Sequence, residues 1–184
     1  MGNLTSLPTN LPAPIDDGAA KHLIGLSLPA VTLPSTAGSF IAMSKLNGIT
    51  VIYCYPMTGQ PEVPLPEGWD AIPGARGCTP QSCSYRDHYA ELKALGAEVY
   101  GLSTQTTEYQ QEMVNRLHLP FSVLSDHSLA FARELNLPTF QVSGMTLLKR
   151  LTLICNGNRI EHVNYPVFPS DADIDKVIDH LKGR

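Results

Sequence analysis

The sequence predicts an α/β protein in which helices cover a mixed β-sheet. Three observations support this prediction: short strand-like runs alternate with helix-like segments, a hairpin signal comes late in the chain, and a final amphipathic helix follows it. With 184 residues, 43% of them hydrophobic, the chain is long enough to bury the core of one domain and short for two. We therefore expect a single domain over residues 21–184, preceded by an extended, proline-containing arm over residues 1–20.

The expected strands are runs of β-branched and aromatic residues bounded by glycine or proline. The run 49–55, closed by Pro56, is almost continuously apolar, which is typical of a strand buried on both faces of a sheet. Cys54 is then a core residue. Asn156-Gly157-Asn158 is a strong hairpin signal between the last two strands. The other strands are expected at residues 30–33, 39–43, 97–103, 121–124, 147–155 and 159–165.

The expected helices begin at capping residues and show apolar residues three and four positions apart. The first begins at or beside Cys78, with Thr79 as its candidate N-cap and Pro80 in its first turn, and it runs to Gly96. Three further helices are expected to open at Thr107 with Gln110 as its capping-box partner, at Asp126, and at Ser170 with Asp173 three residues on.

Charge and hydropathy exclude several classes of function. The net charge is −4, and the 13 basic residues are scattered among 17 acidic ones, so no basic patch suits nucleic acid or anionic lipid. No apolar run approaches the ~20 residues of a membrane span, and the N-terminus lacks the pattern of a signal peptide. We expect no nucleic-acid or membrane partner and a cytoplasmic, reducing location, which suits four cysteines outside a secreted framework.

Two of those cysteines open the first expected helix. Cys78 follows a Gly- and Pro-rich turn, so its sulfur faces unpaired backbone N–H groups and the positive end of the helix dipole. Thiols in such positions have pKa values lowered from about 8.5 into the reactive range. Cys83 lies roughly 7.5 Å further along the axis at about 1.5 Å per residue, whereas a disulfide needs Cα atoms within about 7 Å. We therefore predict a switch, in which the first turns unwind before Cys83 reaches a sulfenic acid on Cys78.

The residues alone leave other interpretations of this pair open. Two incidental buried thiols are the simplest, since free cysteine is among the most buried residues. A Cys-x4-Cys pair can also be half of a zinc site, although the histidines of this chain are scattered. A disulfide-exchange enzyme more often has Cys-x-x-Cys, which does not occur here.

A long segment precedes the cysteine helix. Residues 59–77 contain four prolines, four glycines and Trp69, the single tryptophan of the chain. Loops of this length are uncommon inside compact domains. The segment is either a lid or binding loop, or a packed surface excursion anchored by Trp69.

Several short motifs occur in order along the chain. They are Tyr55-Pro56 at a strand end, the stretch 77–87 around the two cysteines, Gly101-Leu102-Ser103-Thr104, and Leu124-Ser125-Asp126. Together they closely resemble the peroxiredoxins, especially the PrxQ or bacterioferritin-comigratory branch, from about residue 24 to the end. The resemblance implies a thioredoxin-like fold, no bound cofactor, and a monomer or homodimer. It also implies that Cys78 is the peroxidatic cysteine and Cys83 the resolving one, with a hydroperoxide substrate and a thioredoxin-type dithiol reductant.

The resemblance also points to an arginine far from the cysteines in sequence. The family places it at the start of the strand before the final hairpin, and Arg150 occupies the matching place. A fixed guanidinium would stabilise the Cys78 thiolate and hold the peroxide oxygens as charge shifts across the O–O bond. Lys149 would then point to the other face of the strand.

One part of the family pattern is displaced. Peroxiredoxins have Pro-x-x-x-Thr/Ser-x-x-Cys, but Ala71 and Ala75 stand at the proline and hydroxyl positions before the cysteine. Pro56 and Thr58 supply both groups if the 59–77 segment folds out and returns, and Pro73 is the alternative shielding proline.

The leading hypothesis is therefore a thiol peroxidase in which Cys78 attacks a hydroperoxide and Cys83 resolves the sulfenic acid. Two alternatives remain: a thioredoxin-fold binding module that responds to redox state, and a disulfide reductase without peroxidase turnover.

Overall fold

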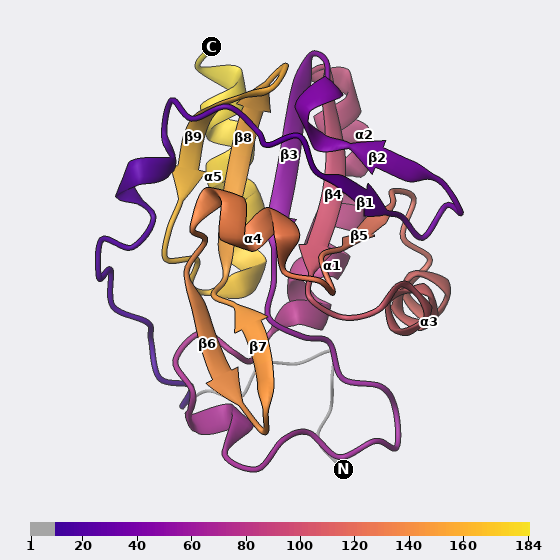
Figure 1. Ribbon diagram of the computed structural model, residues 1–184, viewed down its shortest axis with the longest axis vertical. Coiled ribbons are helices and arrows are strands. Elements are labelled where there is room, and N and C mark those ends of the chain that lie inside the picture. The colour runs from indigo at the N-terminus through magenta and orange to yellow at the C-terminus, as the bar shows by residue number, and fades with distance from the viewer. Residues whose placement is uncertain (1–9) are drawn as a thin grey trace.

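The computed structural model describes residues 10–184, with a five-stranded sheet at its centre (Figure 1). The strand order is β5-β4-β3-β8-β9. The strands are β3 (Ile49–Cys54), β4 (Ala97–Ser103), β5 (Val123–Ser125), β8 (Leu151–Asn156) and β9 (Arg159–Asn164). Because β3 pairs in parallel with β4 and antiparallel with β8, the sheet is mixed and β3 is central, as predicted.

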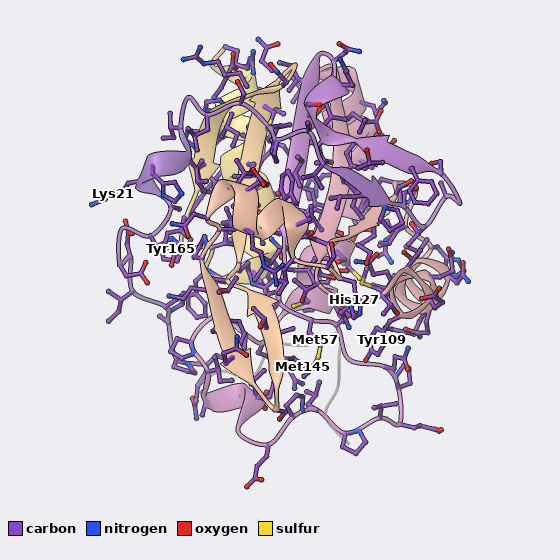
Figure 2. All side chains as sticks on the ribbon, viewed as in Figure 1. Lys21, Met57, Tyr109, His127, Met145 and Tyr165 are labelled. Atoms are coloured by element: carbon purple, nitrogen blue, oxygen red, sulfur yellow. The ribbon has the colours of Figure 1, made fainter. Side chains whose placement is uncertain are left out.

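Helices cover both faces of the sheet. Successive side chains of β3 point to opposite faces, and because they are apolar on both, each face needs a covering layer. Val51 and Tyr53 point into a core made with the helices α1 (Cys78–Asp87), α2 (Tyr89–Ala94), α3 (Thr107–Leu117) and α5 (Asp173–Lys182). Ile52 and Cys54 point into a second core beneath α4 (Ala130–Leu135). Figure 1 shows α4 in front of the sheet and α5 behind it. Side chains fill both layers (Figure 2).

The N-terminal part of the chain lies on the α4 side. It contains the antiparallel strands β1 (Thr32–Pro34) and β2 (Phe40–Ala42) and the short 3-10 helices η1 (Lys21–Leu23) and η2 (Met43–Lys45). The arm predicted over residues 1–20 lies partly outside the described residues. From residue 10 onwards it is extended, and Asp17 accepts hydrogen bonds from Lys149 Nζ at 2.6 Å and Tyr165 Oη at 2.8 Å. The Lys149 contact is the main cause that lowers the pKa of Asp17 well below its usual range.

A hairpin that we did not predict lies at the end of the sheet. The single strand expected at 147–155 is wrong, because the chain turns at Lys149 and Arg150 between β7 (Met145–Leu148) and β8. β7 pairs instead with β6 (Thr139–Val142). This hairpin packs against the 59–77 segment through a small apolar cluster (Figure 2) containing Met57, Trp69, Leu147 and Met145.

Several helix starts differ from their predicted caps. α1 begins at Cys78 itself, with Gly77 at its N-cap in the left-handed region (φ 106°), so the Thr79 cap is wrong. The N-cap of α3 is Thr106, whose hydroxyl accepts from the Tyr109 backbone N–H at 3.4 Å, one residue before the expected position. The expected single helix to Gly96 breaks at His88 into α1 and α2.

The predicted starts of the last two helices, Asp126 and Ser170, both differ from the structure. The predicted start at Asp126 is wrong, because α4 begins at Ala130 with Leu129 at its N-cap. The Asp126 carboxylate nevertheless accepts from the backbone N–H groups of Phe131 at 3.0 Å and Ala132 at 2.8 Å in the first turn. Ser170 does not cap α5. It lies in a 3-10 turn, η4 (Ser170–Ala172), and α5 starts at Asp173, whose side chain turns into the core. None of the helices between residues 10 and 184 is long and apolar enough to cross a membrane.

Candidate active site

Cys78 is the first residue of α1, and its side chain is buried. The thiol donates a long hydrogen bond to the Ala75 carbonyl at 3.6 Å, and the sulfur accepts one from Arg150 Nη2 at 3.1 Å. The Ala75 carbonyl can therefore accept the thiol proton, and the Arg150 guanidinium can stabilise the thiolate. The left-handed Gly77 permits this tight entry into the helix, because other residues rarely adopt its backbone conformation.

Arg150 is held by more than the sulfur. It directly precedes β8 and is 3% exposed, and its Nη2 also donates to the carbonyls of Gly74, Ala75 and Arg76 at 3.3, 3.1 and 3.2 Å. Its Nη1 donates to Gln81 Oε1 in α1. The guanidinium thus ties the segment entering α1 to the sheet. The structure brings Arg150 and Cys78 together, as the family resemblance implied.

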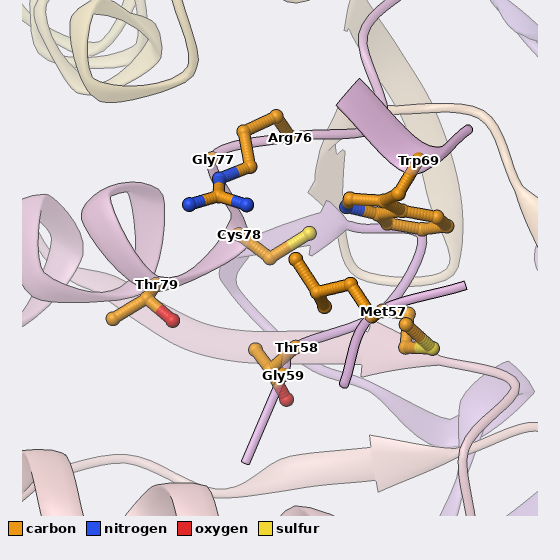
Figure 3. Close-up of a pocket in the computed structure, with 9 residues that line it drawn as sticks. Met57, Thr58, Gly59, Trp69, Arg76, Gly77, Cys78 and Thr79 are labelled. Atoms are coloured by element: carbon orange, nitrogen blue, oxygen red, sulfur yellow. The ribbon is translucent and has the colours of Figure 1, made fainter. Parts of the chain in front are cut away.

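A small pocket opens beside the Cys78 sulfur (Figure 3). Its free volume is about 20 Å³, little more than a water molecule needs. Figure 3 shows the sulfur pointing toward the Trp69 ring, with Met57 and Thr58 on the adjoining wall. The lining residues are Met57, Thr58, Gly59, Leu65, Trp69, Arg76, Gly77, Cys78 and Thr79.

The 59–77 segment therefore forms part of the pocket wall and is also packed. Trp69 is 3% exposed within η3 (Trp69–Ala71) and lies against the Phe140 ring, with centroids 6.3 Å apart. Arg76 forms an ion pair with Asp70 at 3.1 Å across the segment. The segment is therefore anchored by Trp69, as the second interpretation predicted, and it also lines the pocket.

Thr58 returns to the pocket as expected, but its hydrogen bonds go elsewhere. The Thr58 backbone N–H and hydroxyl both donate to Gln105 Oε1, at 3.0 and 3.3 Å, and Gln105 Nε2 donates back to the Thr58 carbonyl at 3.2 Å. Pro56 is buried but is not part of the pocket lining. Pro73 lines a different cavity, of about 410 Å³, beside Arg150 and Phe140.

The remaining cysteines differ from Cys78. Cys83 lies in the same helix as a free, half-buried thiol, and burial raises its pKa. Cys54 and Cys155 are fully buried on the central strands, as predicted for Cys54, and burial raises the pKa of Cys155 to about 12. Across residues 10–184, no group of three or more His, Cys, Asp or Glu side chains is placed to hold a metal ion.

Two residues behind the site, Gln81 and Asp173, were not predicted from the sequence as site residues. Gln81 stands three positions after Cys78, a spacing that places both on one side of a helix, and this signal could have identified it. Asp173 resembled an ordinary capping residue, so nothing local distinguished it.

The sequence and the fold of this chain are similar to those of known proteins. A mixed sheet with helices on both faces, carrying a cysteine at the first turn of a helix, defines a thioredoxin-like thiol protein, and the family model named Redoxin matches residues 24–178. The chain is 30% identical to the chloroplastic peroxiredoxin Q of Sedum lineare over 166 residues, 89% of this chain and 80% of that one. It is 31% identical over 104 residues to the putative peroxiredoxin bcp of Coxiella burnetii, 56% of this chain and 59% of that one.

Solved structures agree on the fold. The crystal structure of peroxidoxin BcpB from Mycobacterium tuberculosis superposes with a TM-score of 0.71 at 22% identity, covering 87% of this chain and 96% of that one. A PrxQ mutant from Xylella fastidiosa gives a TM-score of 0.70 at 16% identity, over 87% and 95% of the two chains. The chain belongs to the redoxin family and, within it, to the peroxiredoxin Q group of the peroxiredoxins. The predicted fold class is confirmed, and the protein is a thiol-dependent peroxidase.

Proposed function

We propose that Cys78 attacks a hydroperoxide, that Cys83 resolves the product, and that an external thioredoxin-type dithiol reduces the resulting disulfide. The observation that supports this assignment best is the contact between Arg150 Nη2 and Cys78 Sγ at 3.1 Å, in a buried position at a helix start. A guanidinium in that place stabilises the thiolate and the charge that develops on the peroxide oxygens.

The chemistry proceeds in three balanced steps. The Cys78 thiolate attacks the terminal peroxide oxygen, an S–O bond forms as the O–O bond breaks, and the leaving alkoxide or hydroxide takes a proton to become an alcohol or water. The Cys83 thiolate then attacks the sulfenic sulfur, forming the disulfide and releasing water. Two thiols of the reductant finally restore both cysteines by thiol–disulfide exchange, and the reductant becomes a disulfide.

The second step needs a conformational change. Both cysteines are free in α1, and at about 1.5 Å per residue five steps hold their Cα atoms about 7.5 Å apart along the axis. Disulfide formation therefore requires the first turns of α1 to unwind. Gly77 before the helix and the break at His88 after it leave only ten residues to rearrange.

The roles of Thr58 and Pro56 are assigned from where these residues lie. We assign Thr58 as the hydroxyl of the site, because it lines the pocket and its hydroxyl can turn from Gln105 to a peroxide oxygen. We assign Pro56 as the shielding proline of the site on the family pattern, since it is buried two residues before Thr58. Residues 21–184 form the peroxidase domain, which acts as a monomer or homodimer. Four free cysteines suit a reducing compartment such as the cytoplasm.

Two cysteine variants test the proposal. Cys78→Ser is expected to abolish peroxide consumption with thioredoxin and its reductase, and normal turnover in this variant would overturn the assignment. Cys83→Ser is expected to react once and stop, with intact mass showing one added oxygen after one equivalent of peroxide. Wild type should instead lose two hydrogens as the internal disulfide forms. An added oxygen on wild type would show that Cys83 is not the resolving residue.

The alternatives predict different results. A disulfide reductase would reduce insulin with dithiol and without peroxide, and a redox-responsive binding module would react with peroxide without sustained turnover. We expect no insulin reduction and continuous turnover.

A further inference from the structure

Asp173 is a buried carboxylate that the reaction steps above do not use. It is the first residue of α5, 1% exposed, and no ion pair formed by residues 10–184 includes it. Burying a carboxylate is costly unless hydrogen bonds satisfy it. Four donors do so here: Gln81 Nε2 at 3.2 Å, Tyr85 Oη at 2.7 Å and Thr152 Oγ1 at 2.6 Å to Oδ2, and Asn164 Nδ2 at 3.0 Å to Oδ1.

One of these donors connects Asp173 to the reactive sulfur. Gln81 gives its Nε2 hydrogen to Asp173 and accepts from Arg150 Nη1 on its Oε1. The other terminal nitrogen of Arg150 donates to Cys78 Sγ. Three consecutive hydrogen bonds therefore run from the α5 start to the thiol, and Gln81 and Arg150 are 0% and 3% exposed.

The carboxylate decides which way the Gln81 amide faces. A glutamine side chain has an acceptor end and a donor end, whereas a guanidinium only donates and a carboxylate only accepts. With Asp173 in place, only one orientation satisfies both neighbours, and it presents oxygen to Arg150. Without the charge, the amide can turn its NH2 group toward the guanidinium and release it. Such networks are strong in a buried, low-dielectric setting.

We propose that Asp173 is a positioning residue for the peroxidase reaction, which orients Gln81 and through it holds the Arg150 guanidinium against Cys78 and the peroxide. It touches neither sulfur nor substrate. This inference rests on the proposed function, in which Arg150 stabilises the charge that moves across the O–O bond. Displacing a catalytic group by about 1 Å can cost on the order of 100-fold in rate.

The primary test is the rate constant for the first reaction of reduced protein with hydrogen peroxide, measured by rapid mixing. Asp173→Asn is expected to lower this rate by about 10-fold or more. Gln81→Met, which leaves Asp173 with three donors, should give a similar loss. Because both changes break the same chain, the double variant should be no worse than either single one, whereas independent structural damage would add.

The matched control is Thr152→Val. It removes a hydrogen bond to the same carboxylate oxygen but leaves the link through Gln81 to Arg150 intact. We expect its rate constant to stay within about twofold of wild type. This nearly isosteric change lies outside the hydrogen bonds that join Asp173 to Cys78 through Gln81 and Arg150, so it costs stability rather than reaction rate. A loss as large as that of Asp173→Asn would overturn the proposal.

An exchange of the two side chains provides a rescue. Gln81→Glu alone places two carboxylates together and should be slow. In the pair Gln81→Glu with Asp173→Asn, the amide again donates to position 81, and position 81 again accepts from Arg150. Tyr85 and Thr152 can rotate their hydroxyls to suit. We expect the pair to recover to within about threefold of wild type, because the coupling is pairwise.

The outcomes separate this inference from the proposed function. If wild type fails to react with peroxide at Cys78, the proposed function fails. If wild type reacts and folded Asp173→Asn reacts equally fast, or the double variant shows additive losses, only the positioning role fails. If Asp173→Asn does not fold, Gln81→Met decides the question by the same rate.

Discussion

Arg150 Nη2 lies 3.1 Å from Cys78 Sγ although the two residues are 72 positions apart in the chain. The contact depends on the antiparallel pairing of β8 with β3, which places the start of β8 beside the end of β3. α1 then begins near this same end of the two strands, the carboxyl end of β3. The reactive sulfur therefore receives its cation from the residue that directly precedes β8, the strand paired with β3.

Replacing Arg150 should slow the reaction with peroxide strongly. We expect Arg150→Met to lower the rate constant for hydrogen peroxide by about 100-fold, the usual cost of removing a donor aimed at developing charge. Arg150→Lys should fall in between, because it keeps the charge and loses the planar fork. Rapid-mixing kinetics on reduced protein measures both rates. Arg133→Met, at an exposed position on α4, is the control. A wild-type rate for Arg150→Met would contradict the role.

Cys83 should ionise at a higher pH than an ordinary thiol while α1 is folded. Burial raises its pKa, because the thiolate form is penalised when water is excluded. In the Cys78→Ser variant, alkylation of Cys83 by iodoacetamide, followed by peptide mass mapping, should show a midpoint on the alkaline side of the ordinary thiol range. Adding urea should move that midpoint down.

The same shift has a defined sign for stability. A folded-state pKa above the unfolded one contributes stability below the unfolded value and loses it as pH rises through the folded value. The difference in stability between Cys78→Ser and Cys78→Ser/Cys83→Ser should therefore change only at alkaline pH. A midpoint at or below that of a free thiol would show that the burial of Cys83 does not control its ionisation.

The pocket wall should determine which peroxides react. With about 20 Å³ beside the sulfur, hydrogen peroxide is accommodated more readily than cumene hydroperoxide. We expect Leu65→Ala and Trp69→Ala to raise the cumene-to-hydrogen-peroxide ratio of kcat/KM by roughly 10-fold, within the range that pocket contacts of this kind supply. Val63→Ala is the control, because Val63 lies on the same segment, is 51% exposed and does not line the pocket. An unchanged ratio in both pocket variants would exclude the wall as the determinant.

Gly101 should not tolerate a side chain. A Cβ atom there would lie 2.8 Å from the Tyr53 hydroxyl oxygen and 2.9 Å from its ring carbon Cζ. Tyr53 cannot move easily, because its ring stacks on Tyr85 at 4.4 Å and is fully buried. Gly101→Ala should therefore reduce the free energy of unfolding in urea by about 1–3 kcal/mol.

Gly183→Ala is the matched control for that experiment. A Cβ atom there would meet the Asp179 carbonyl at 3.5 Å, an ordinary contact. We expect a change within about 0.5 kcal/mol. Equal stability losses for the two variants would show that the Tyr53 ring does not restrict position 101.

Much of the fold could be predicted from short windows of the sequence. The apolar run that became β3, the turn at Asn156-Gly157-Asn158 and the helix start at Cys78 each follow from local backbone preference and periodicity. The exact helix caps could not be predicted. Neighbouring Thr106 and Thr107 have the same capping chemistry, and the structure has Thr106 at the N-cap. The β6–β7 hairpin was missed because its strands are short and partly exposed.

The sequence by itself determined the nature of the chemistry: two thiols in one helix, with the first at the helix start. Tertiary structure alone decided what surrounds that thiol. Arg150 meets Cys78 through strand order, Trp69 and Thr58 meet it through the path of the 59–77 segment, and Asp173 supports it from the start of the last helix. The physical reason is that local conformation is encoded in adjacent residues. Contacts between distant residues depend on sheet register and packing, which no short window contains.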